Sequence, residues 1–161
     1  MIKLSLEVVQ MKIGIANDHA ATQLKNTIME YLQGEGYEVV NFGTNSLESF
    51  DYPVAAETLA NAVASGEVEF GIAICGTGVG ISIACNKVKG IRACVCSDTT
   101  SAKLTRLHNN ANIICFGARI VGEELAKDLV DTFLETSFTH DERHQRRIDM
   151  ITDIENRQYK A

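Results

Sequence analysis

The sequence predicts an α/β protein in which helices cover both faces of a five-stranded parallel sheet, in three α/β/α layers. Short apolar runs alternate along the chain with longer segments of helical periodicity, which is typical of repeated βα units. The apolar runs are rich in Val and Ile without polar alternation, which is typical of strands buried on both faces. The 161 residues, 45% of them hydrophobic, are enough for one compact domain with its own core.

Five segments have the length and composition of strands. They are residues 12–16, 37–42, 70–74, 91–96 and 112–117. Two helix starts are indicated between them, because Asp51 lies two residues before Pro53, the only proline, and Asp98 directly precedes Thr99. Apolar residues at a spacing of four mark further helical faces, namely Leu24, Ile28 and Leu32, and then Leu125, Leu129 and Phe133.

Both ends of the chain carry segments outside this alternation. Residues 142–157 predict an extra C-terminal helix, on which Ile148, Ile151 and Ile154 recur at every third position. This apolar stripe must pack either on its own domain or on a partner subunit. Residues 1–10 are either an additional strand or an extension, so that the domain itself spans residues 11–161.

The composition excludes several classes of protein. A formal net charge of −6 argues against a nucleic-acid surface, because such surfaces cluster Lys and Arg against phosphates. No apolar stretch approaches the roughly 20 residues that span a membrane. The five cysteines lie in or beside apolar runs, which is typical of reduced thiols in a cytoplasmic protein. We expect Cys94 and Cys96 to point to opposite faces of their strand and therefore not to share a metal ion.

Polar residues follow the first predicted strand. In open parallel sheets, ligands bind at the carboxyl ends of the strands. Asn17, Asp18 and His19 stand at such an end, where a dinucleotide-binding fold would have a glycine-rich turn. A carboxylate beside an imidazole suits a polar substrate. Asp18 is also placed to cap the next helix, and the two roles are compatible.

A glycine-rich loop follows the third predicted strand and begins with a cysteine. The loop consists of Cys75, Gly76, Thr77, Gly78, Val79 and Gly80. Alternate glycines let backbone N–H groups approach a ligand and form a nest for an anion. The same N–H groups favour thiolate over thiol, which makes Cys75 a better base. The alternative is a buried cysteine in a tight turn.

Three arginines are candidates for binding an anionic substrate. Arg119 follows the fifth predicted strand, and Arg143 and Arg147 lie four residues apart on one face of the last helix. Paired guanidinium groups suit a phosphate, which they bind bidentately. The alternative is a solvated charged surface. His140 and His144 have helical spacing, but the sequence indicates no convincing set of metal ligands.

His108 lies at the end of the fourth predicted helix, next to Asn109. A helix of about ten residues runs about 15 Å back from the carboxyl edge of the sheet. We therefore expect His108 to lie far from Cys75 of its own chain. A catalytic His108 would reach the cleft of a neighbouring subunit.

Together these motifs resemble the ribose-5-phosphate isomerase B family. The resemblance runs from Met11 through the rest of the chain, and its most specific parts are the Cys-Gly-Thr-Gly loop and the Arg-His-Gln of residues 143–145. It implies a Rossmann-like domain, a homodimer or dimer of dimers with active sites shared between subunits, and no cofactor. It also implies an isomerase of the pentose phosphate pathway that converts ribose 5-phosphate to ribulose 5-phosphate through an enediolate.

The resemblance further implies a role for each matching residue. Cys75 would abstract the C2 proton, His108 would donate a proton during ring opening, and the glycine loop would stabilise the enediolate. The phosphate would be held by Arg119, Arg143 and Arg147, with help from His19. The other positions that match substrate contacts are Asp18, Tyr52, Thr77 and Asn109.

Two alternatives stay open on the sequence. The protein could isomerise allose 6-phosphate or galactose 6-phosphate, since related chains share the loop and the fold. It could also be a non-catalytic sugar-phosphate-binding protein built on the same fold. The complete set of Cys75, Thr77, His108 and arginines favours an enzyme.

Overall fold

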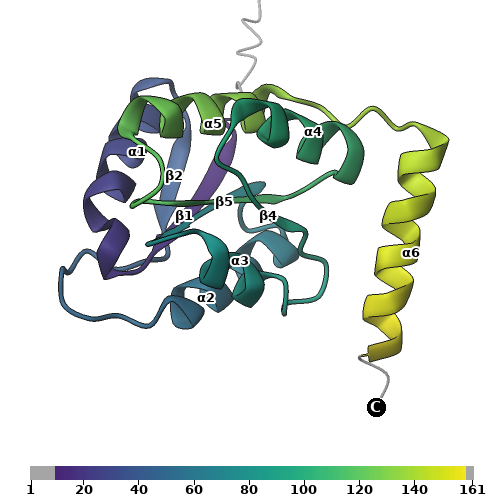
Figure 1. The fold of residues 1–161 in the computed structure, drawn as a ribbon, viewed down its shortest axis with the longest axis horizontal. Helices are drawn as coiled ribbons and strands as arrows, with labels where there is room; N and C mark the ends of the chain where they lie inside the picture. The colour runs from purple at the N-terminus through teal and green to yellow at the C-terminus, as the bar shows by residue number, and fades with distance from the viewer. Residues whose placement is uncertain (1–9, 159–161) are drawn as a thin grey trace, which may run out of the picture.

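The computed structural model describes residues 10–158, which form a parallel sheet covered by helices (Figure 1). The five strands lie in the order β2-β1-β3-β5-β4, and every neighbouring pair is parallel. They are β1 (Lys12–Asn17), β2 (Glu38–Asn41), β3 (Phe70–Cys75), β4 (Ala93–Val95) and β5 (Ile113–Gly117). The predicted α/β fold with a five-stranded parallel sheet is confirmed. The predicted extension lies, except for Gln10, outside the described residues.

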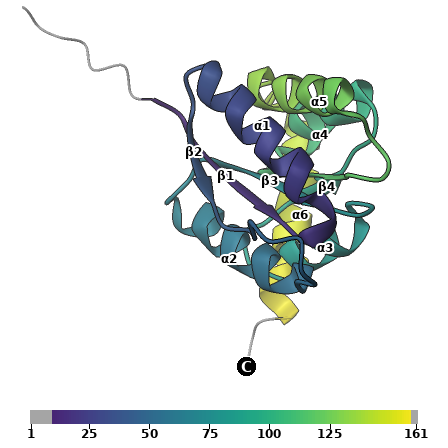
Figure 2. The same cartoon turned by 90° about the vertical axis from the view of Figure 1, so that its left-hand side faces the viewer.

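The helices form a layer on each face of the sheet (Figure 2). They are η1 (His19–Ala21), α1 (Thr22–Gly34), α2 (Tyr52–Ser65), α3 (Val79–Cys85), α4 (Thr99–Asn109), α5 (Glu123–Glu135) and α6 (Glu142–Gln158). Helices α1, α4 and α5 pack together over one face, and α2 and α3 pack together over the other. Helix α6 stands apart beyond the β4 edge (Figure 1). The predicted C-terminal helix is therefore confirmed.

Two apolar cores, one on each face, hold the layers to the sheet. The first is formed by the predicted stripes of α1 and α5, including Ile28 and Phe133, which are fully buried. The second lies between the sheet and α2 and α3, around Leu59 and Ile81. Since β1, β3 and β5 are buried on both faces, they match the apolar pattern that predicted them.

The edge strands are shorter and less buried than their sequence suggested. Residues 91–96 were expected to form a strand, but β4 spans only Ala93–Val95. The N–H of Arg92 donates to the side chain of Asn112 at 2.8 Å instead of continuing the ladder. The prediction for Cys94 and Cys96 is wrong, because both side chains pack against the same core. Residues two apart on a strand share one face of the sheet.

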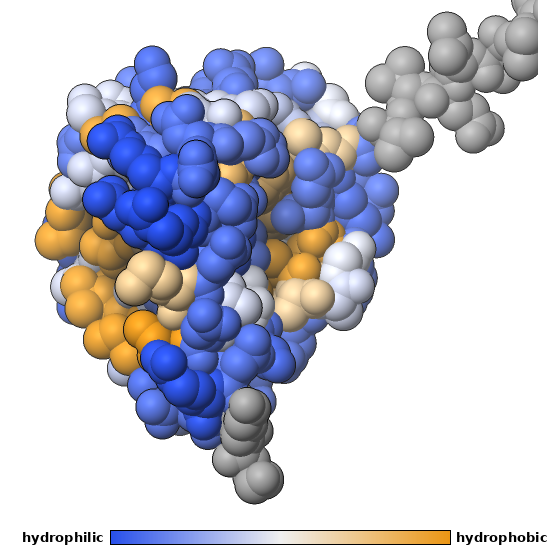
Figure 3. All heavy atoms as spheres, turned by 90° about the vertical axis from the view of Figure 1, so that its right-hand side faces the viewer, coloured by the Kyte–Doolittle hydropathy of each residue, from blue (hydrophilic) through white to orange (hydrophobic). Residues whose placement is uncertain are grey.

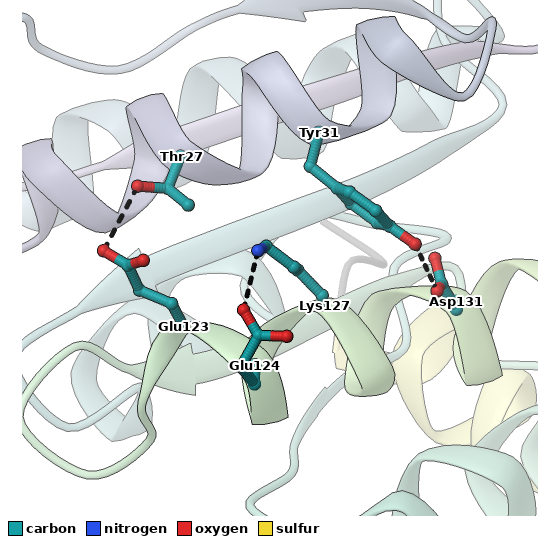
Figure 4. A network of polar contacts seen from close by, with 6 residues as sticks. All are labelled: Thr27, Tyr31, Glu123, Glu124, Lys127 and Asp131. Carbon is teal, nitrogen blue, oxygen red and sulfur yellow. Dashed lines mark hydrogen bonds and ion pairs between the residues drawn. The ribbon is translucent and has the colours of Figure 1, made fainter.

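Polar contacts join α1 to α5 on the surface (Figure 4). Tyr31 donates a hydrogen bond to Asp131 at 2.5 Å, and this bond to a carboxylate raises the pKa of Tyr31 above its usual range. Thr27 donates to Glu123 at 3.5 Å. Within α5, Lys127 pairs with Glu124 at 2.8 Å. The first two contacts link α1 to α5 over the first core.

Candidate active site

The thiol of Cys75 lies inside the turn between β3 and α3. Cys75 is the last residue of β3 and is only 4% exposed. Its Sγ accepts a hydrogen bond from the backbone N–H of Gly78 at 3.1 Å. Gly78 has a φ of 80°, and a Cβ there would lie 2.7 Å from the carbonyl carbon of Phe116 on β5. Only glycine therefore allows this turn to bring its N–H to the sulfur while packing against the neighbouring strand.

The ends of β1 and β5 flank this turn. The N–H of Asp18 donates to the carbonyl of Ile74, and the N–H of Ala118 donates to the carbonyl of Cys75 at 2.8 Å. The carboxylate of Asp18 accepts from the N–H of Ala20 at 3.0 Å, so the predicted cap is present. The guanidinium of Arg119 lies over Gly76, since a Cβ at that glycine would be 3.4 Å from Nη1. Asp18 and Arg119 thus follow the two strands that flank β3 and its thiol.

His19 is held in a defined orientation by the segment that precedes α2. Its Nδ1 accepts a hydrogen bond from the backbone N–H of Phe50 at 3.1 Å. The carbonyl oxygen of Phe50 lies farther from the same nitrogen, at 3.4 Å. Because the backbone N–H can only donate, the shorter contact assigns the proton of the neutral ring to Nε2. His19 can therefore present an N–H donor to an anionic group.

Tyr52 brings the start of α2 against the glycine loop. A Cβ at Gly80 would lie 2.6 Å from Cζ of the Tyr52 ring, so the ring covers this glycine closely. Pro53 occupies the first turn of α2, as predicted, although the side chain of Asp51 makes no capping hydrogen bond.

In α4, by contrast, Asp98 accepts from the N–H of Ser101 at 2.7 Å and caps the helix.

A second group of predicted site residues lies at the amino ends of the strands, opposite the carboxyl ends where Cys75 lies. His108 and Asn109 end α4, and the guanidinium of Arg92 donates to the carbonyl of Asn109 at 2.9 Å. Arg92 directly precedes β4, so this end of α4 lies beside the amino end of that strand. The registered strands place Cys75 opposite Gly117, at the carboxyl end. The five-residue length of β5 alone separates the two edges by about 16 Å.

Helix α6 adds its arginines to this second group. The imidazoles of His108 and His144 stack with centroids 4.2 Å apart and planes at 14°. His144 is 5% exposed, and burial, His108 and Arg143 lower its pKa. Arg143 and Arg147 are exposed on the same helix. They lie beside His108 rather than beside Arg119.

The apolar stripe of α6 faces a cavity next to β4. Ile148 is buried against its own domain, whereas Ile151 and Ile154 are 47% and 52% exposed. They line a cavity of about 680 Å³ together with Ile91, Ala93 and Cys94. Figure 3, which looks onto this side, shows apolar surface beside strongly polar surface. The described part of this chain therefore leaves part of the stripe uncovered.

The predicted site residues thus form two groups that one chain does not bring together. The first, the thiol group, consists of Asp18, His19, Tyr52, Cys75, Gly76, Thr77, Gly78, Val79, Gly80 and Arg119. The second, the arginine group, consists of His108, Asn109, Arg143 and Arg147. The predicted separation of His108 from Cys75 is present, and a site shared between subunits stays a prediction.

Sequence reasoning missed two residues that shape these groups. His144 was considered only within the basic motif and, with His140, as a pair too small to hold a metal ion, yet its ring packs on His108. Lys25 was not singled out, because a lysine beside an apolar helical stripe is normally solvated. The structure buries it completely.

Between residues 10 and 158, no group of three or more His, Cys, Asp or Glu side chains is placed to hold a metal ion. In the same range, no helix is long and apolar enough to cross a membrane.

Comparison with known proteins identifies the family. The profile of the Ribose/Galactose Isomerase family matches residues 13–151. The chain belongs to this family. It is 52% identical over 146 residues to ribose-5-phosphate isomerase B of Escherichia coli (strain K12), covering 91% of this chain and 97% of that protein. The resemblance inferred from the motifs is confirmed, and with it the prediction of an isomerase.

Solved structures of the family have the same fold. Ribose-5-phosphate isomerase B of Clostridium thermocellum aligns with a TM-score of 0.90 at 51% identity, over 92% of this chain and 99% of that one. The enzyme of Mycoplasma genitalium, solved with bound ribulose 5-phosphate, aligns with a TM-score of 0.86 at 40% identity. That alignment covers 91% of this chain and 97% of the other. The family fold therefore extends over nearly the whole chain.

Proposed function

We propose that this protein interconverts ribose 5-phosphate and ribulose 5-phosphate, as in the pentose phosphate pathway, and that Cys75 is the base. The observation that carries the proposal is the hydrogen bond from the N–H of Gly78 to Sγ of Cys75 at the carboxyl edge of the sheet. This donor stabilises negative charge on the sulfur. The relatives named above support the choice of substrate.

The chemistry moves one proton between adjacent carbons. The Cys75 thiolate takes the proton from C2 of the open-chain aldose, the electron pair forms the C1–C2 double bond, and negative charge develops on O1. Backbone N–H groups of the loop from Gly76 to Gly80 stabilise that oxygen, with Thr77 as a further donor. The thiol then returns the proton to C1 while a proton passes from O2 to O1. The product is the ketose.

The arginine group would complete the site from a second copy of the chain. In this proposal, Arg143 and Arg147 bind the phosphate together with Arg119 and the Nε2–H of His19. His108 donates a proton during ring opening, and Asn109 contacts the sugar. Since one chain holds these residues at the opposite edge from Cys75, a homodimer with shared sites accounts for both groups.

Turnover measured in deuterated water tests the reaction. The protein is incubated without metal with ribose 5-phosphate, allose 6-phosphate and galactose 6-phosphate, and the ketose and the deuterium at the transferred position are followed. We expect the fastest turnover with ribose 5-phosphate. Faster turnover of a six-carbon substrate would replace the proposed substrate by the alternative, and no turnover of any of them would leave only a binding protein.

Two substitutions test the assigned roles separately. Cys75→Ala should abolish isomerisation, by at least about 10³-fold in kcat, and should leave sugar-phosphate binding intact, because only the base is removed. Arg143→Ala should mainly weaken binding, because it removes one phosphate ligand. Binding is measured by calorimetry and turnover by ketose formation. An equal loss of binding in both variants would make Cys75 a structural residue.

A further inference from the structure

Lys25 on α1 is a fully buried lysine without an acidic partner. Its exposure is 0%, and its Nζ donates a hydrogen bond to Oδ1 of Asn45 at 2.5 Å. Among the ion pairs of residues 10–158, none involves Lys25. Burial lowers its pKa. Burying an ammonium group costs several kcal/mol unless strong hydrogen bonds compensate. The hydrogen bond to Asn45 is therefore the contact that compensates for the burial of the Lys25 ammonium group.

Asn45 belongs to an irregular segment, residues 42–51, which we call the β2–α2 loop. Its Oδ1 also accepts from the amide of Asn41 at 2.9 Å. One helical turn before Lys25, the hydroxyl of Thr22 donates to the carbonyl of Ser46 at 2.8 Å. Leu47 is 67% exposed, so the tip of the loop has no apolar anchor. The polar contacts from α1 hold this part of the loop in place.

The other end of the same loop enters the thiol group. The N–H of Phe50 fixes Nδ1 of His19 at 3.1 Å, and two residues later Tyr52 covers Gly80. Only four residues separate Asn45 from Phe50. We therefore expect a displacement of Asn45 to reach the N–H that orients His19, although the Phe50 ring also packs against the second core.

We propose that Lys25 is a positioning residue: by holding Asn45, it fixes the β2–α2 loop and, through Phe50, the orientation and tautomer of His19. The role of His19 in phosphate binding rests on the proposed function, whereas its hydrogen bond to Phe50 does not. Lys25 itself stays out of reach of the substrate, because it is fully buried beneath the loop.

The direct test is the nitrogen NMR spectrum of the His19 ring in the free protein. The wild type should show one neutral tautomer with the proton on Nε2, and His19→Asn identifies the signal by removing it. Lys25→Met keeps the length of the side chain and its burial but removes the hydrogen bond. It should give a mixture of tautomers and faster exchange of the Phe50 amide. Lys127→Met, which removes a surface lysine from α5, should give the wild-type spectrum.

A second variant keeps the test decisive if Lys25→Met fails to fold. Asn45→Ala removes the acceptor on an exposed residue, and it should change the His19 tautomers in the same way. The double variant should add nothing to either single change, because both remove one contact. An unchanged His19 spectrum in the folded variants would overturn the proposal.

Kinetics separate this inference from the proposed function. In Lys25→Met and Asn45→Ala, KM for ribose 5-phosphate should rise about 3- to 10-fold, with kcat within about twofold of the wild type. A larger loss in kcat than in binding would contradict positioning through His19. If the wild type turned over no sugar phosphate while the tautomers still changed, the proposed function would fail and the role of Lys25 would stand.

Discussion

At the scale of single residues, the glycine at position 78 decides the geometry of the thiol. Its φ of 80° and its contact with the backbone of Phe116 both exclude a side chain. Gly66, at the end of α2, has a φ of 78° but no atom within 4 Å of an added Cβ. The two positions share the same backbone conformation and differ only in the space around them.

Gly78→Ala should therefore lower the free energy of unfolding more than Gly66→Ala does. The left-handed conformation costs an alanine about 1–2 kcal/mol at either position. Only at position 78 does a backbone clash add to this, and it displaces the N–H from Cys75. We expect Gly66→Ala to lose about 1 kcal/mol of unfolding free energy in urea and to keep full activity. Gly78→Ala should lose more stability and nearly all turnover. Equal losses would mean that the turn can shift away from β5 at little cost.

At the scale of elements, the docking of α6 depends on a buried imidazole. The His144 ring packs on His108, and its Nε2 lies 3.5 Å from the guanidinium of Arg143 and 4.0 Å from the carboxylate of Asp141. Burial, the neighbouring imidazole and the arginines lower the pKa of His144 below its usual value of 6.5. The unfolded chain therefore takes up a proton at this position more readily than the folded chain does. The stability that neutral His144 contributes is present above about pH 6.5 and is lost as the pH falls through its folded pKa.

His144→Phe should reduce this acid sensitivity, because phenylalanine keeps the stacked ring and does not titrate. Thermal unfolding between pH 7.5 and pH 5 measures the effect, and the decrease in Tm on acidification should be smaller in the variant than in the wild type. His140→Asn is the matched control. It removes an exposed imidazole, and asparagine tolerates the positive φ of 58° at this position. Parallel decreases in the wild type and in His144→Phe would contradict this role.

The elements also show what local sequence can and cannot predict. The buried strands and the stripes of α1 and α5 were predictable, because their apolar period depends only on burial. The length of β4 was not, since the strand begins only after Arg92, whose N–H donates to the side chain of Asn112, 20 residues away. Lys25 was hidden for the same reason, because its partner Asn45 is brought to it by the sheet and not by the neighbouring sequence.

For the candidate site, the residues at the strand ends were predictable from the rule that ligands bind at carboxyl edges. Cys75, Asp18 and Arg119 do lie together there. The contact between His19 and Phe50 was not predictable, because it depends on the path of an irregular loop. The placement of α6 was open as well. The apolar stripe of Ile148, Ile151 and Ile154 predicts that this helix face is packed, but it does not predict which surface it packs against.

At the scale of the whole molecule, the two groups of site residues predict complementation between inactive chains. If each site takes Cys75 from one chain and Arg143 from another, a mixed dimer of Cys75→Ala and Arg143→Ala has one intact site. Random reassociation of equal amounts makes half of the dimers mixed, so about one quarter of wild-type activity should return.

The measurement compares each variant alone with the mixture after unfolding and refolding together. Each variant refolded alone should stay at its own low activity. A mixture of Cys75→Ala with His19→Asn serves as the control, because both changes fall in the thiol group and no mixed dimer has an intact site. Activity no higher than the average of the separate variants would place Arg143 and Cys75 in the same chain's site.

The position of α6, apart from the body of the molecule, bears on how such an enzyme selects the size of its sugar. In a shared site, the spacing between the sulfur and the guanidinium groups is set by how two chains dock, and no loop of one chain determines it. One residue along a helix corresponds to about 1.5 Å, which is close to the length of a carbon–carbon bond. A displacement of α6 along its axis by that distance, without rotation, would lengthen or shorten the site by about one carbon. The geometry of the interface would then determine the length of the substrate. Members of the family could differ in their preference for five- or six-carbon substrates while keeping the same proton-abstracting group.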